Sequence, residues 1–173
     1  MQRKRSRDLG ILVGSVELAP VPDAAGVLCP YAEAYPGVPA EDWEPYRALY
    51  PELFVEDGWR LPCLSYLIRS SEVTILVDTG VGPPGLWDWT AEEEGLLPAS
   101  LAALGVGVDE VDVVFLTHLH IDHIGWNTDL DGVPFFPRRA TSSTVTLSPL
   151  RCATRTGRTS VAVPSRSSIA SSR

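Results

Sequence analysis

Short apolar runs rich in β-branched residues recur along the first 137 positions of this sequence and favour strands over helices. A run over residues 10–18 predicts a first strand. Runs over residues 61–69 and 73–78 are separated by a short polar turn, which predicts a hairpin. The run over residues 111–117 is almost continuously apolar, which is typical of a strand buried on both faces.

Two stretches favour helices instead. Residues 40–49 begin with acidic side chains that suit a helix start, and residues 98–104 begin with a proline and are followed by Gly105, which can cap the end. The rest of residues 19–61 is rich in proline and aromatic residues and predicts a loop-like insertion. Its aromatic side chains either wall a substrate pocket or dimer contact, or cover the sheet edge.

The charge balance divides the chain in two. The 173-residue sequence has a net charge of −8, which makes nucleic acid an improbable partner for its main body. Residues 1–137 contain 7 basic and 22 acidic residues, whereas residues 138–173 contain 7 arginines and no acid. We therefore expect a globular part over residues 1–137 and a separate tail over residues 138–173.

The tail carries 15 serines and threonines among its 36 residues, has no aromatic residue and shows no sustained apolar period. This composition is typical of disorder. Three explanations stay open: a basic segment that binds nucleic acid or an acidic surface, a plain linker, or translation out of frame. A shifted frame best accounts for the abrupt loss of acidic and aromatic residues, and the other two reading frames of the gene would show it.

The cysteines and the amino terminus bear on the compartment. Cys29, Cys63 and Cys152 are odd in number and far apart, so we expect reduced thiols rather than a disulfide framework. The apolar run over residues 11–16 is too short for a signal-peptide core or a membrane span. The expected location is the cytoplasm, with no membrane partner.

All three histidines of the chain lie in one stretch, Thr117-His118-Leu119-His120-Ile121-Asp122-His123, at the end of the buried run 111–117. Two histidines spaced two residues apart point to the same side of an extended backbone. Imidazole and carboxylate groups at this spacing suit Zn²⁺ or a similar metal ion. The alternative is a set of surface histidines in a polar turn, which would be an unusual coincidence in a chain with three.

The stretch resembles the T-H-x-H-x-D-H signature of the metallo-β-lactamase-fold hydrolases, and THLHIDHIGWN is most similar to their lactonase and organophosphate-hydrolase branch. The resemblance implies that His118 and His120 bind one metal ion and that Asp122 and His123 bind a second. It also implies that Asp122 orients the nucleophile as a catalytic residue. Val77-Asp78-Thr79-Gly80 matches a family motif whose aspartate orients the ligand loop, so Asp78 would support the histidine ligands.

The resemblance covers residues 10–137 and implies an α/β fold, the first half of a four-layer αβ/βα sandwich. It implies zinc, with iron or manganese as substitutes, and hydrolysis of a small ester, lactone, thioester or phosphotriester by metal-activated water. The family completes its site with two further histidines and an aspartate downstream. This sequence has no histidine after His123 and no acid after Asp131.

We therefore expect weak metal binding and little hydrolysis, and the alternative function is a non-catalytic metal-binding fragment. Half a sandwich also leaves an apolar sheet face bare, which favours a homo-oligomer formed through that face.

Overall fold

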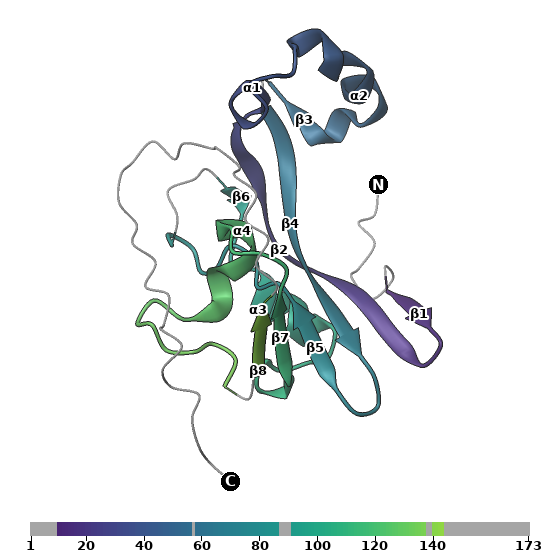
Figure 1. Ribbon diagram of the computed structural model, residues 1–173, viewed down its shortest axis with the longest axis vertical. Coiled ribbons are helices and arrows are strands. Elements are labelled where there is room, and N and C mark those ends of the chain that lie inside the picture. Colours follow the sequence, from purple (N-terminus) through teal and green to yellow (C-terminus); the bar gives the residue numbers. More distant parts are fainter. Residues whose placement is uncertain (1–9, 57, 87–90, 138–139, 144–173) are drawn as a thin grey trace.

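The computed structural model describes residues 10–56, 58–86, 91–137 and 140–143, which form a twisted sheet with short helices around it (Figure 1). The sheet has eight strands, and its main path runs β1-β2-β4-β5-β7-β8, with β3 beside β4 and β6 beside β2. The strands are β1 (Ile11–Val13), β2 (Val16–Pro30), β3 (Phe54–Val55), β4 (Gly58–Arg69), β5 (Thr74–Val77), β6 (Ala91–Glu93), β7 (Val113–Leu116) and β8 (Ala140–Ser143).

Strand direction changes once across the sheet. The pairs from β1 to β5 are antiparallel, and β4 and β5 form the hairpin that the apolar pattern predicts. The pairs β5–β7 and β7–β8 are parallel. The carboxyl ends of β5 and β7 therefore lie side by side at one edge of the sheet.

The helical elements are short. Two of them, η2 and α2, together span the predicted helix over residues 40–49, and α3 is the predicted helix over residues 98–104, shifted by one residue. They are α1 (Tyr31–Ala34), η2 (Ala40–Trp43), α2 (Glu44–Leu49), η3 (Pro51–Leu53), α3 (Leu97–Ala103), η4 (Val108–Glu110), α4 (Ile121–Ile124) and η5 (Gly125–Asn127). Among the described residues, no helix combines the length and apolar character needed to cross a membrane.

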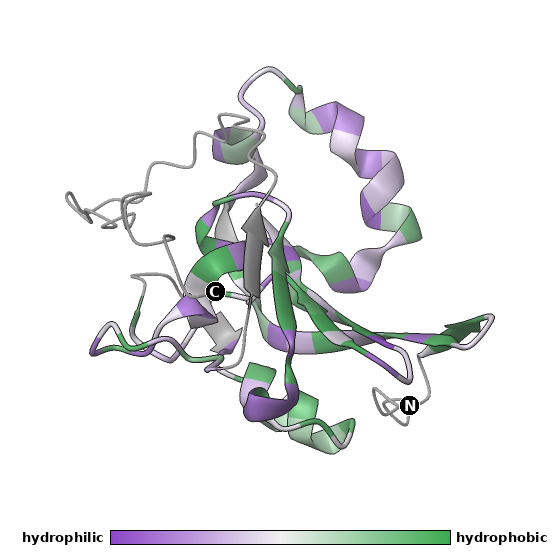
Figure 2. Ribbon diagram, turned by 60° about the horizontal axis from the view of Figure 1, so that its bottom comes forward, coloured by the Kyte–Doolittle hydropathy of each residue, from purple (hydrophilic) through white to green (hydrophobic). Residues whose placement is uncertain are grey.

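The hydrophobic core lies on one face of the sheet, under α3. Figure 2 shows the central strands coloured mainly as hydrophobic. The buried cluster combines inward-facing strand residues with residues from α3 and from the loops that flank β7. Its members are Ala19, Val21, Leu67, Leu76, Leu97, Leu101, Leu104, Val106, Val111, Val114, Leu116, Trp126 and Phe136.

The opposite face of the sheet is also apolar, but its side chains are mostly half-buried, and Tyr66 is exposed. These residues alternate with the core residues along each strand, as the pleat of a sheet requires. The strand register aligns them in two cross-strand rows without a charged residue. The rows are Leu18–Ile68–Ile75–Val113 and Pro20–Tyr66–Val77–Phe115.

The prediction for residues 10–18 is wrong in detail, because this run contains a hairpin. Val13 pairs with Val16 across the two-residue turn Gly14-Ser15, and Gly14 has φ 64°. Positive φ at the first central residue suits the tight turns that join antiparallel strands.

The loop-like prediction for residues 19–61 is wrong at both ends. Pro20 and Pro22 lie within β2, which continues to Pro30, and β4 begins at Gly58. Between Leu18 and Ala25, β2 pairs with β4 alone among the described strands. An edge position tolerates proline, because the missing N–H would have pointed to the open side.

The prediction that a strand begins over residues 133–137 is also wrong. This segment makes a single bridge, between Thr128 and Pro134, and buries Phe136 in the core. Most of the predicted tail, residues 138–139 and 144–173, lies outside the described residues. Residues 140–143 form β8 beside β7.

Candidate metal centre

The histidine motif begins directly after β7, at the sheet edge where β5 also ends. Phe115 of β7 pairs with Val77 of β5. Asp78 directly follows β5 and Thr117 directly follows β7, so the two residues leave neighbouring strands at the same edge of the sheet. His118 to His120 then lead into α4, which carries Asp122 and His123. Parallel strands thus bring the two sequence motifs together, as is usual for sites at the carboxyl edge of a sheet.

The three histidine rings form one cluster. The centroid of the His118 ring lies 4.5 Å from that of His120 and 3.8 Å from that of His123. Nε2 of the His123 ring lies 3.2 Å from Oδ2 of Asp122. The structure therefore brings together all four side chains for which metal binding is predicted.

Asp78 joins the end of β5 to this cluster. Its backbone has φ 60°, a left-handed conformation that few residues other than glycine, asparagine and aspartate adopt. Its carboxylate accepts hydrogen bonds from the backbone N–H of Thr117 at 2.8 Å and from Oγ1 of Thr117 at 2.8 Å. Its Oδ2 also lies 2.8 Å from Nδ1 of His123. The residue predicted to support the ligand loop thus contacts that loop at both ends.

The ionisation of the cluster reflects these contacts. Burial lowers the pKa of His123, but hydrogen bonds with Asp122 and Asp78 outweigh burial and raise that pKa to about 9. Burial raises the pKa of Asp78, and the hydrogen bonds from His123 and Thr117 lower it by more, so the carboxyl is held below its usual range. Burial and the neighbouring His123 and His120 both lower the pKa of His118.

The donor set suits zinc chemically, since three imidazoles and one carboxylate are borderline and hard ligands that zinc accepts. Within the described ranges, no group of three or more His, Cys, Asp and Glu side chains is arranged ready to hold a metal ion. The reason is visible in the contacts, because Nε2 of His123 faces the Asp122 carboxylate and Nδ1 of His118 lies 3.0 Å from Oγ1 of Thr117. Metal binding by these side chains would therefore require them to turn.

Comparison with known protein families shows which family the chain belongs to. The sequence model of one family, described as "Metallo-beta-lactamase superfamily", matches residues 58–147. The chain belongs to the metallo-beta-lactamase superfamily. The matched range includes β4, β5, β7 and the whole histidine motif.

Two curated relatives are bacterial lactonases. N-acyl homoserine lactonase AiiB of Agrobacterium fabrum is 35% identical over 78 residues, covering 38% of this chain and 28% of the relative. N-acyl homoserine lactonase of Bacillus thuringiensis is 32% identical over 93 residues, covering 46% of this chain and 37% of the relative. The chain thus matches about a third of the length of these curated relatives.

Solved structures show the same fold. AidC, a dizinc quorum-quenching lactonase, matches with a TM-score of 0.65 at 23% identity, over 76% of this chain and 42% of that one. The hydrolase AbOPH of the beta lactamase superfamily matches with a TM-score of 0.63 at 24% identity and the same coverage. The α/β fold expected from the motif resemblance is confirmed, over less than half the length of these structures.

Two backbone segments of this superfamily member interlock beneath the cluster. The N–H of Thr79 donates to the carbonyl of His123 at 2.8 Å, and the N–H of Trp126 donates to the carbonyl of Thr79 at 3.0 Å. The N–H of Gly125 donates to the carbonyl of Gly80 at 2.8 Å. The loop after β5 and the segment after the histidines therefore run against each other, backbone to backbone.

Asp23 is a buried polar residue that the sequence analysis missed. It lies within β2 at a register shift between Pro22 and Ala24, and its side chain is fully buried. Burial raises its pKa, while hydrogen bonds from Trp126, Leu97, Val81 and Gly82 act in the opposite direction. The signal in the sequence was an aspartate inside a run of apolar and proline residues. Because an unpaired carboxylate is rarely buried, an aspartate in such a run indicates hydrogen-bond partners elsewhere in the fold.

Cys63 is a second buried titratable residue near the site. It lies on the core-facing side of β4, in a small cluster with Ala24 and Val81. Burial, Asp122 and Asp23 together raise the pKa of its thiol to about 12. The thiol is therefore protonated at neutral pH and is no nucleophile, which agrees with the expectation of a buried, reduced cysteine.

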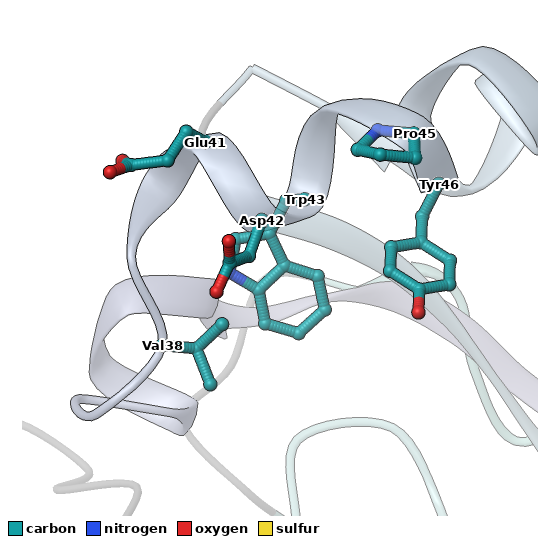
Figure 3. A pocket seen from close by; sticks show the side chains of 6 residues that line it. All are labelled: Val38, Glu41, Asp42, Trp43, Pro45 and Tyr46. Carbon is teal, nitrogen blue, oxygen red and sulfur yellow. The ribbon is translucent and has the colours of Figure 1, made fainter.

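The proline-rich insertion folds as an aromatic arm at the far end of β2 and β4 (Figure 1). Trp43 packs near the rings of Tyr31, Tyr35 and Trp59 with centroids 5.4 to 5.6 Å apart. A hollow of about 600 Å³ opens on this arm (Figure 3). It is lined by Val38, Glu41, Asp42, Trp43, Pro45 and Tyr46, and no predicted metal ligand reaches it.

Proposed function

We propose that this chain carries the metal-binding part of a zinc-dependent hydrolase that opens small lactones or related esters. The observation that carries the proposal is the convergence of all three histidines of the sequence with Asp122 at one edge of the sheet. Its family membership supports hydrolytic chemistry, and the relatives named as N-acyl homoserine lactonases support a lactone as the substrate class.

The proposed roles follow from the side-chain contacts. His118, His120, Asp122 and His123 would hold one or two zinc ions, which supply a Lewis acid and lower the pKa of water. Asp78 accepts the Nδ1–H of His123, so Nε2, which faces Asp122 in the structure, is the ring nitrogen that would turn to a metal ion. The same carboxylate holds Thr117, which fixes where the chain leaves β7 for His118. Asp122 would also orient the attacking water.

A non-catalytic metal-binding module is the rival function. Its support is that, within the described residues, the His, Cys, Asp and Glu side chains form no group arranged ready to hold a metal ion. Four protein ligands do not fill two zinc sites, since catalytic zinc usually takes three protein ligands and a water. We therefore expect slow turnover of lactones, esters and phosphotriesters, and the two functions differ in whether a chelator abolishes any hydrolysis.

Zinc binding tests both functions. The protein is expected to bind zinc weakly, and the His118→Ala and His120→Ala variants are expected to bind it at least about tenfold more weakly still. The matched control is Leu119→Ala, because Leu119 lies between the two histidines and is exposed. Isothermal titration with zinc and metal analysis give the affinities and contents. A protein that holds no zinc, iron or manganese, with variants indistinguishable from it, would contradict the proposal.

We also propose that a second copy of the chain packs on the uncovered sheet face. The two rows on this face are uncharged and expose apolar area. A matching partner surface would also be uncharged and apolar, and a second copy of the chain carries such a surface. Burying this apolar area would stabilise the dimer by roughly 25 cal/mol per Å². Such an interface would be isologous, with each face contacting its own copy.

The Tyr66→Glu variant tests this dimer. Tyr66 is 43% exposed in the middle of the face, so two glutamates would meet or be buried in a two-fold interface. We expect the dissociation constant measured by sedimentation to rise at least about tenfold. Leu130→Glu is the control, since Leu130 is an exposed apolar residue in the loop after the histidine motif. A protein that is monomeric at high concentration would refute the interface.

A further inference from the structure

Asp23 lies outside the histidine motif, but its buried carboxylate contacts several segments around the site. Its Oδ2 accepts the N–H groups of Val81 at 2.7 Å and Gly82 at 3.2 Å. Its Oδ1 accepts the N–H of Leu97 at 2.9 Å and the indole N–H of Trp126 at 2.9 Å. One buried carboxylate therefore binds three segments that are distant in sequence.

Two of these segments carry the site. Val81 and Gly82 directly follow Asp78, Thr79 and Gly80, and Trp126 comes three residues after His123. The third partner, Leu97, is the first residue of α3, which packs on β2. Asp23 thus joins both site segments to the rigid part of the fold.

The fit around Asp23 is close. A Cβ added to Gly80 would lie 2.2 Å from Oδ2 of Asp23, so the carboxylate occupies the space that a side chain at position 80 would need. The backbone hydrogen bonds from Thr79 to His123 and from Trp126 to Thr79 couple the position of this loop to that of the histidine segment. A shift of Asp23 would move both the carboxylate of Asp78 and the ring of His123.

We propose that Asp23 is a positioning residue, which holds the Asp78 loop and the His123 segment in the relative placement that metal binding requires. The inference rests on the proposed metal-binding function, but it concerns a residue that neither binds the metal ion nor contacts its ligands. It predicts that loss of the carboxylate disturbs the histidines more than an equal loss of stability elsewhere does.

The Asp23→Asn variant is the direct test. The amide keeps the shape of the carboxylate but replaces one acceptor oxygen with an NH₂ donor. Each oxygen of Asp23 accepts two N–H groups, so in the variant two of the four N–H donors would face the NH₂ group instead of an acceptor. The control is Leu101→Ala, which removes a fully buried side chain from the core cluster and destabilises the fold but leaves Asp23 and its four hydrogen-bond donors unchanged. Both variants are studied where they remain folded.

Two measurements separate positioning from stability. The first is zinc affinity, which we expect to fall about tenfold more in Asp23→Asn than in Leu101→Ala, at the low end of the range for partners behind metal ligands. The second uses the metal-free protein, in which the three histidines give the only imidazole signals in the NMR spectrum. The His123 ring signals are expected to shift or broaden in Asp23→Asn and to stay in place in Leu101→Ala.

The outcomes are distinct. If Asp23→Asn matches Leu101→Ala in both measurements, Asp23 is only a stabilising residue and the inference is wrong. If no variant and no wild-type protein binds zinc while the His123 signals respond to Asp23→Asn, the proposed function fails and the positioning role stands. If Asp23→Asn does not fold, Trp126→Phe replaces it, since this change removes one donor to Asp23 and keeps an aromatic ring. Unmoved His123 signals in a folded Trp126→Phe protein would then overturn the inference.

Discussion

The Gly125→Ala variant is expected to fold poorly or not at all, with its free energy of unfolding lowered by more than about 4 kcal/mol. A Cβ at this position would lie 1.9 Å from the carbonyl carbon of Val81, 2.1 Å from its oxygen and 2.2 Å from the nitrogen of Gly82. All three are backbone atoms, so no side-chain rotation relieves the overlap. Gly125 has φ −61°, an ordinary value, so the requirement for glycine is purely steric.

Urea denaturation of the purified variant measures this effect. The control is Gly37→Ala, because a Cβ at position 37 meets no atom within 4 Å. Its unfolding free energy is expected to stay within about 0.5 kcal/mol of the wild type. A Gly125→Ala protein whose free energy of unfolding lies within about 1 kcal/mol of the wild-type value would show that the two site segments do not pack as closely as described.

The Asp78→Asn variant is expected to lose about 3 kcal/mol of stability and to weaken zinc binding about 10- to 100-fold. Asparagine tolerates the positive φ of this position, so the change tests the carboxylate charge rather than the backbone. The charge accepts hydrogen bonds from Thr117 and from the protonated His123, and the amide cannot accept all of them. The ring of His123 would lose the contact that orients it.

Asp112→Asn is the matched control for this charge removal. Asp112 also accepts a backbone N–H, that of Thr74 at 2.9 Å, but it is exposed and lies before β7, at the opposite end of that strand from the histidines. We expect its zinc affinity to equal that of the wild type in calorimetric titration. Equal zinc affinities for Asp78→Asn and Asp112→Asn would remove Asp78 from the site.

Local patterns in the sequence were sufficient for several strands and one helix. The hairpin of β4 and β5, the buried strand β7 and the helix α3 all have apolar runs of the right length with turn residues at their ends. The meeting of Asp78 with the histidine motif was implied by the motif resemblance. It follows physically because both motifs come directly after strands, and the parallel pairing of β5 and β7 places those strand ends together.

Features that depend on distant partners were decided by the tertiary structure. Local propensity argues against a strand through Pro20 and Pro22, yet pairing with β4 extends β2 through them at the sheet edge. The burial of Asp23 depends on four N–H donors from three other segments, none of which is its neighbour in sequence.

The same holds for Gly125, which is required because another backbone passes beside it. The sequence by itself determined which residues are proposed to carry the metal-binding chemistry, because that proposal rests on side-chain type and short spacing. Only the tertiary structure decided what holds those residues in place, because long-range hydrogen bonds and backbone contacts leave no periodic pattern in the chain.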